Sequence, residues 1–222
     1  MKSFHLILSL IIFLTFSVNA QKNYYGGFGY GSFAFGSIAT KNINSLVGLN
    51  QNISANAVSG GGGGFAYFSR FVIGGSGNGA SGSTFTSNGV DYNITHGWGG
   101  LEAGYDFSNN VKNKITATFM IGGRGTNINI LNGNDKDKSI SNGSALVGIN
   151  LYLLRFLVSN KTDDDGGIGG FMLGFKAGAW MGLESSKWEF EGNLPLNRVS
   201  YTPYGVNIGI TIGGGGFGYK KK

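Results

Sequence analysis

The sequence has no cysteine, only two prolines and a low share of charged residues, 13% of 222 positions. Without cysteine there is no disulfide scaffold, no Cys-ligated zinc or iron–sulfur site and no thiol nucleophile. The net charge of +6 is modest and spread along the chain, so a nucleic-acid partner is not expected. The 41% apolar share is too high for a disordered chain.

Long apolar runs are also missing beyond the N-terminus. The stretch from Leu6 to Phe16 is apolar almost throughout, follows Lys2, and precedes the short residues of positions 17–20. This pattern predicts a secretory signal peptide over residues 1–20, cleaved near Ala20. No later stretch reaches the roughly 18 apolar residues of a spanning helix. The mature chain is therefore expected to be exported, either soluble or inserted in a membrane as β-strands.

Glycine, by contrast, occupies 42 positions. It has no three-residue period, which excludes collagen, and it costs about 1 kcal/mol at each helix-interior position. The apolar residues alternate with other types: over 115–124 and 171–184 the odd positions are apolar, whereas over 204–212 the even positions are. A period of two predicts β-strands with two different faces.

Eight strands are predicted, over 24–38, 61–75, 79–87, 94–107, 113–130, 144–158, 168–184 and 201–218. The segments between them alternate between long polar stretches and shorter ones, as extracellular loops and periplasmic turns do in membrane barrels. The fold class is therefore predicted to be all-β, an antiparallel up-and-down transmembrane β-barrel of about eight strands. Ten strands is the alternative if 79–87 is not a strand. The glycine runs at 60–64 and 213–216 are predicted to mark bulges or bends.

With this pattern the chain resembles the small outer-membrane barrels of Gram-negative bacteria, of the OmpA/OmpX type. The Ala20–Gln21 junction is similar to signal-cleavage sites common in Bacteroidetes. The resemblance covers nearly all of 21–219 and implies a single barrel domain over 21–222, located in the bacterial outer membrane and in contact with its lipid. Such barrels end on an aromatic residue that serves assembly. Phe217 and Tyr219 fit this, whereas the basic tail 220–222 departs from it.

Eight strands enclose an interior just wide enough for side chains to fill, which makes a general porin an unlikely function. A polar interior network is predicted from the inward-facing charged and polar residues, which are Arg70, His96, Glu102, Arg124 and Lys176. Because buried charges must be paired, we expect Glu102 to meet one or more of the cations. Counting across the 108–113 turn predicts that Arg124 lies close to His96 and Trp98.

The favoured function is a non-enzymatic outer-membrane barrel with a structural, adhesive or accessory-subunit role. Other outer-membrane proteins are the further partners expected, met through extracellular loops. Trp188, Phe190 and Arg198 are the candidate loop contacts. One alternative is a lipid-modifying barrel enzyme with His96 as its base. Another is a soluble exported glycine-rich β structural protein.

No cofactor and no metal site are predicted. Two acidic segments, 135–137 and 163–165, resemble Ca²⁺ ligands in composition. Neither has the spacing of an EF-hand loop with its closing Glu.

Overall fold

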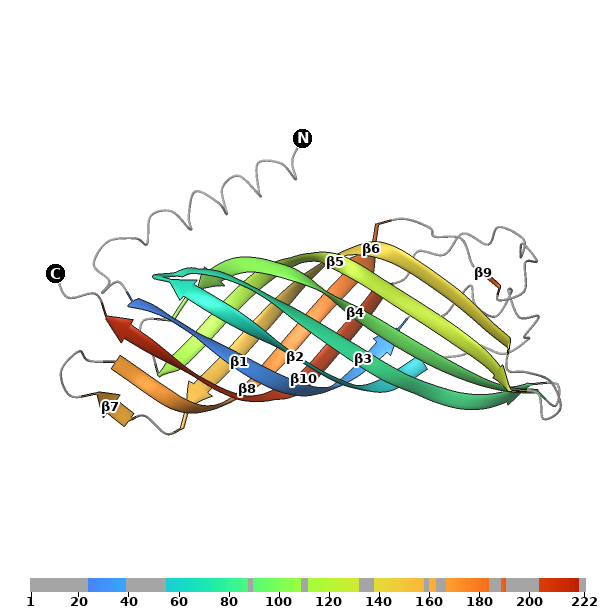
Figure 1. Ribbon diagram of the computed structural model, residues 1–222, viewed down its shortest axis with the longest axis horizontal. Helices are drawn as coiled ribbons and strands as arrows, with labels where there is room; N and C mark the ends of the chain where they lie inside the picture. The colour runs from blue at the N-terminus through green and yellow to red at the C-terminus, as the bar shows by residue number, and fades with distance from the viewer. Residues whose placement is uncertain are drawn as a thin grey trace, which may run out of the picture.

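In the computed structural model the chain forms a closed antiparallel β-barrel of eight long strands (Figure 1). The structure describes residues 24–38, 55–87, 90–108, 112–131, 138–157, 160–162, 167–183, 189–190 and 204–219. The long strands are β1 (Tyr24–Ile38), β2 (Ala55–Phe68), β3 (Phe71–Ser87), β4 (Val90–Asp106), β5 (Asn113–Leu131), β6 (Lys138–Phe156), β8 (Gly167–Gly182) and β10 (Tyr204–Tyr219). Two short strands, β7 (Asn160–Thr162) and β9 (Glu189–Phe190), pair with β8 and β6. The predicted class and the count of eight are confirmed.

Pairing of β1 with β10 closes the barrel. It runs without interruption from Tyr24 opposite Tyr219 to Ile38 opposite Gly205. Each remaining long strand pairs with the long strand that follows it in the chain, including β6 with β8. The first and last described strands therefore begin and end at the same end of the barrel, which we call the terminal end (Figure 1).

The alternation seen in the sequence separates the inside of the barrel from the outside. On β5, Ile115, Phe119 and Ile121 are exposed, whereas Thr118 and Met120 between them are buried. The same holds on β8 and β10, so an apolar belt covers the outer surface while polar and aromatic side chains fill the interior. That is the arrangement of transmembrane barrels.

No helix long and apolar enough to cross a membrane occurs in the part of the chain that the structure describes.

The β2–β3 hairpin differs from the prediction. Strands 61–75 and 79–87 were expected around a turn at 76–79, but the turn lies at Ser69–Arg70, and β3 runs through the glycine-rich stretch as regular strand. Ser69 has a φ of 61° and Ser69 N donates to Tyr24 O at 2.7 Å. Because of this two-residue turn, odd-numbered residues face the interior on β2, whereas even-numbered residues face it on β3. The run Gly-Ser-Gly-Asn-Gly has turn-like composition, but its backbone groups are paired on both sides, with β2 and with β4.

The predicted bulges at the glycine runs are also wrong. Register is continuous through 60–64 in both of its pairings and through 213–216 in both of its own. The irregularity between paired strands lies instead in β3, between Ser81 and Thr84. Phe217, which follows the second glycine run, faces the interior, where it is 3% exposed.

One side of the barrel is taller than the other. At the end away from the termini, β3, β4, β5 and β6 continue past Gly182, where β8 ends, and Tyr204, where β10 begins (Figure 1). On β6, pairing with β8 starts at Leu146, so its residues 138–145 belong to this projection. The longest connections, 39–54 and 183–203, also leave from this end. By the usual asymmetry of membrane barrels it is the extracellular end, and we call it the outer end.

Candidate functional site

The interior carries most of the chemistry of the described chain, and it divides into three levels. Nearest the terminal end is a fully buried ion pair in which Lys114 Nζ lies 2.8 Å from Asp106 Oδ2. Asp106 also accepts hydrogen bonds from the Tyr24 hydroxyl and from Ser108 N. Lys114 Nζ sits 3.5 Å from the centre of the Tyr24 ring and 4.8 Å from that of Phe217. Neither charged residue was singled out from the sequence.

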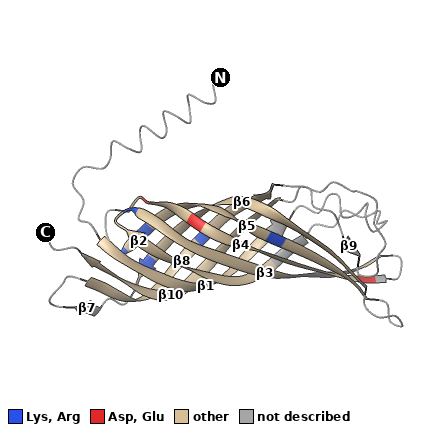
Figure 2. Cartoon of the chain, turned by 45° about the horizontal axis from the view of Figure 1, so that its top comes forward, with Lys and Arg blue, Asp and Glu red and all other residues tan. Residues whose placement is uncertain are grey.

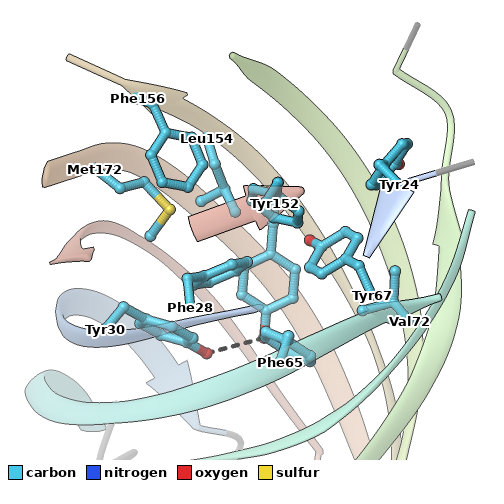
Figure 3. Close-up of a cluster of buried hydrophobic side chains, with 11 residues drawn as sticks. Tyr24, Phe28, Tyr30, Phe65, Tyr67, Val72, Tyr152, Leu154, Phe156 and Met172 are labelled. Atoms are coloured by element: carbon cyan, nitrogen blue, oxygen red, sulfur yellow. Dashed lines mark hydrogen bonds between the residues drawn. The ribbon is translucent and has the colours of Figure 1, made fainter. Parts of the chain in front are cut away.

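An aromatic cluster fills the space around and beyond this pair (Figure 3). Its buried members are Tyr24, Phe28, Tyr30, Phe65, Tyr67, Val72, Tyr152, Leu154, Phe156, Met172 and Phe217. Most of the rings meet at tilted or edge-on angles, for example Phe65 and Tyr152 at 5.1 Å and 70°, the geometry that aromatic quadrupoles favour. Tyr30 and Phe65 are stacked, at 6.1 Å and 9°. The hydroxyls of Tyr30 and Tyr152 are 3.2 Å apart. This packing fills the interior of the barrel near the terminal end.

Glu102 is the centre of the middle level and is 1% exposed. Its carboxylate accepts hydrogen bonds from Ser76, from Thr118 and from the Tyr152 hydroxyl. Lys176 Nζ donates to Ser76 Oγ at 3.2 Å. Glu102 and Lys176 are therefore joined through the Ser76 hydroxyl, which places the acid and one of the predicted cations in a single buried network.

The level nearest the outer end is built around Arg124, which lies opposite Trp98 in the β4–β5 pairing. Its guanidinium donates to Ser144 Oγ at 2.8 Å, to Thr126 Oγ1 at 3.0 Å and to the Asn142 amide oxygen. These neighbours come from β5 and β6. The fork geometry of the guanidinium is thus satisfied by hydroxyl and amide oxygens.

His96 adjoins this group. Its Nδ1 lies 2.7 Å from Thr126 Oγ1, and its ring stacks on Trp180 at 5.1 Å and approaches Trp98 at 5.4 Å. The other ring nitrogen, Nε2, is buried without a hydrogen-bond partner. The structure therefore places Arg124 close to both His96 and Trp98, as the hairpin count predicts, with a register one residue away from that count.

The remaining predicted residues lie elsewhere. Arg70 belongs to the β2–β3 turn rather than to an inward-facing strand position, and its Nη1 donates to the Tyr105 hydroxyl at 2.9 Å. The reason is the misplaced turn, which put Arg70 on the wrong face of a strand. Phe190 lies in β9 opposite Ile140 of β6. Trp188 and Arg198 lie outside the described residues.

Charge is thinly distributed over the barrel wall (Figure 2). Buried charged side chains nevertheless occur at each interior level, and they are Glu102, Asp106, Lys114, Arg124 and Lys176. Within the described ranges, no three His, Asp or Glu side chains come together as a metal site would require. Side chains from all eight long strands occupy the interior, as expected for a barrel of this strand number.

No family model and no curated protein matches the sequence. Solved structures that resemble it include Ail, the attachment invasion locus protein of Yersinia pestis, in complex with the heparin analogue sucrose octasulfate. It has 13% identity and a TM-score of 0.47, over 88% of this chain and 97% of that one. Neisserial surface protein A has 11% identity and a TM-score of 0.46, over 86% and 95%. At these identities the likeness concerns the fold alone, and the barrel is established by its own strand pairing.

Proposed function

We propose that this chain is a non-enzymatic outer-membrane barrel that acts at its outer end, in a structural, adhesive or accessory-subunit role. The observation that carries the proposal is the contrast between a filled interior and an apolar exterior. Glu102, Tyr152 and Lys114 are among the buried side chains inside, whereas Leu101 and Phe175 outside are 77% and 59% exposed. The membrane part is then an anchor, and recognition falls to whatever extends beyond it.

The projecting part of β3–β6 supports this assignment. Its outward positions include Thr86 and Asp91, whose side chains are exposed and hydrogen-bonded to each other, and Ser141 on β6. These polar residues differ from the hydrocarbon side chains lower on the same strands. A rigid polar sheet that stands above an apolar belt is suited to contact with soluble or surface-exposed partners.

Two alternatives are less well supported. A lipid-modifying enzyme would need His96 exposed to lipid and within reach of a nucleophile or acid. His96 instead faces the interior at 5% exposure, and its described neighbours are a threonine, two indole rings and the Arg124 guanidinium, none of which is a nucleophile or acid suited to that role. A soluble glycine-rich protein would need its apolar face covered. The exposed large side chains form a belt far wider than soluble monomers usually carry.

The membrane assignment is tested by running washed outer membranes on a denaturing gel with and without boiling. A mobility shift on boiling is expected, because a closed barrel resists the detergent until it is heated. Recovery in the soluble fraction with no shift would contradict the proposal. The mass of the mature chain from the same preparation tests cleavage near Ala20.

The role at the outer end is tested by site-specific photo-crosslinking in living cells. A photoreactive residue at Thr86 or Ser141 on the projection is expected to capture a partner protein. The matched control is the same residue at Phe171, which is exposed in the apolar belt. Equal labelling patterns at the two places, with lipid adducts alone, would count against a role in protein contact.

A further inference from the structure

One arginine interrupts the lipid-facing surface of the barrel near its terminal end. Arg155 is exposed on the outward face of β6, one residue before the strand ends. Leu153 lies two residues away toward the outer end and Leu157 two residues away toward the terminal end, and both are exposed. In the strand pairings Arg155 is opposite Asn113 of β5 on one side and Leu173 of β8 on the other. The arginine therefore has hydrocarbon side chains as neighbours on three sides.

Within the described ranges, the charge of Arg155 has no counter-charge. Its side chain takes part in no ion pair and no hydrogen bond there. An arginine that faces lipid is costly at the membrane midplane and tolerated near the interface, where it reaches polar groups. Leucine on both sides keeps this one at the boundary of the membrane instead of in open water. An anion that itself belongs to the membrane interface is the counter-charge that such a position requires.

Two polar neighbours lie beside Arg155 at the same edge. Asn113 is opposite it in the pairing of β5 with β6, and its side chain is exposed. Lys112 precedes β5 and is exposed too, and Phe156 N donates to Lys112 O at 2.9 Å. This backbone hydrogen bond fixes Lys112 next to the end of β6. Two positive charges, from Lys112 and Arg155, therefore belong to one short edge formed by β5 and β6.

Charge on the barrel wall is sorted by end (Figure 2). Among the charged residues whose side chains are described and not buried, those at the terminal end are basic and the one at the outer end is acidic. They are Arg70, Lys112 and Arg155 at the terminal end and Asp91 at the outer end. A positive edge of this kind attracts anions.

An apolar surface begins directly beside this edge, on the side toward the outer end. Ile115 of β5, Leu153 of β6 and Phe175 of β8 are opposite one another in the strand pairings, and all three are exposed. An amphiphile with its anionic group at Arg155 would find hydrocarbon along the direction in which its chains extend into the membrane. A soluble anion would make no use of this row. An unpaired interfacial cation next to an apolar row therefore points to a lipid.

We propose that the edge formed by β5 and β6 at the terminal end binds one anionic phospholipid of the inner leaflet. The Arg155 guanidinium donates to the headgroup phosphate, whose oxygens match its planar fork. Lys112 adds the second positive charge, which favours an anionic headgroup over a zwitterionic one. The acyl chains lie along Ile115, Leu153 and Phe175. The inference rests on the proposed membrane location, in which the terminal end faces the periplasm.

The test uses the full mature protein in nanodiscs that contain equal amounts of phosphatidylglycerol and phosphatidylethanolamine with the same acyl chains. After release into mild detergent, native mass spectrometry counts the lipids that stay bound. We expect the wild type to retain one phosphatidylglycerol per barrel in preference to phosphatidylethanolamine. Arg155→Gln should lower the retention of phosphatidylglycerol about fivefold, as loss of one positive charge at a membrane surface does. The double variant with Lys112→Gln should retain the two lipids equally.

Arg70→Gln is the matched control. It removes the same charge from the same end of the barrel, but Arg70 lies in the turn before β3, three strands away from β6, and its Nη1 donates to the Tyr105 hydroxyl. This variant should retain phosphatidylglycerol as the wild type does. An equal loss in Arg70→Gln and Arg155→Gln would overturn the proposal, because it would mean diffuse attraction to the whole edge.

Equal retention of the two lipids by the wild type would also overturn it. That result is expected if the acidic segment 163–165, between β7 and β8 in the sequence, neutralises Arg155 in place of a lipid. A boiling-dependent gel shift checks each variant for folding. The same shift separates the two proposals, because a barrel that folds in the membrane without the lipid preference contradicts only the lipid site.

Discussion

Lys114 Nζ lies 2.8 Å from Asp106 Oδ2, with both side chains fully buried, across the connection between β4 and β5. The pair also contacts the first and last strands of the barrel, β1 and β10. Tyr24, the first residue of β1, donates to Asp106, and Phe217 of β10 packs against the ammonium group. A charge pair in the middle of the chain thus reinforces closure between its first and last strands.

Loss of one member of this pair should destabilise the barrel more than loss of both. Lys114→Met or Asp106→Asn leaves a buried group without its counter-charge, at a cost of about 3–5 kcal/mol, whereas the double variant should cost less. Urea unfolding in detergent, followed by tryptophan fluorescence, measures this. Equal or additive losses would mean that the two groups are not coupled.

The link from Glu102 through Ser76 to Lys176 should appear as a coupling energy. Lys176→Met removes the cation that faces the Glu102 carboxylate, and we expect about 1–3 kcal/mol of destabilisation. In Ser76→Ala the two charges lose their shared hydroxyl. A double-mutant cycle between positions 76 and 176 should give a coupling of about 1 kcal/mol. Arg155→Met, which removes an exposed outward cation, serves as the control and should show none.

Ser69 should respond to substitution through its backbone. Its φ of 61° is in the left-handed region, which costs an L-residue about 1–2 kcal/mol and costs glycine little. Ser69→Gly is therefore expected to raise stability by up to about 1 kcal/mol, and Ser69→Val to lower it. The temperature at which the gel-mobility shift occurs measures both. A lower transition for the glycine variant would contradict the strain at this turn.

Alanine substitution at two glycines should show that the interior of the barrel is crowded and its outer face is not. Gly205→Ala forces a methyl group against the Trp180 ring, and overpacking of this kind costs about 1–3 kcal/mol. Gly79→Ala places the same methyl in open space and should leave stability unchanged or slightly higher. Chemical unfolding of both proteins under one condition gives the comparison. Equal destabilisation by the two variants would argue against the assigned facing of these strands.

His96 is not expected to have a catalytic role. His96→Phe keeps a ring between Trp98 and Trp180, loses the bond to Thr126 and removes the buried unpaired Nε2. These effects oppose each other, so stability should stay within about 1 kcal/mol of the wild type. Lipid extracts from cells with this variant should match those from the wild type. A changed acylation pattern would favour the enzyme alternative.

Much of the interior polar network could be predicted from the alternation of apolar residues alone. Even positions of 95–107 and 115–124 were expected on one face, and this brings His96, Arg124 and Glu102 inside together with Trp98. Asp106 and Lys114 were missed, although both follow the same parity. Both residues lie beside a turn, where charged side chains are common in exposed loops. The signal for the pair would have been two opposite charges at inward positions of one hairpin.

The sequence by itself determined which side of most strands faces lipid, with the predicted strand 61–75 as the exception, because a period of two is a local property of the chain. It also indicated about eight long strands, with ten as the alternative, and the end at which the long loops lie. Tertiary structure alone decided the turn at Ser69–Arg70, the inward position of Phe217 and the meeting of Tyr24 with Asp106. These depend on how the eight strands are staggered when β1 meets β10, and that stagger is a property of the closed barrel that no single segment contains.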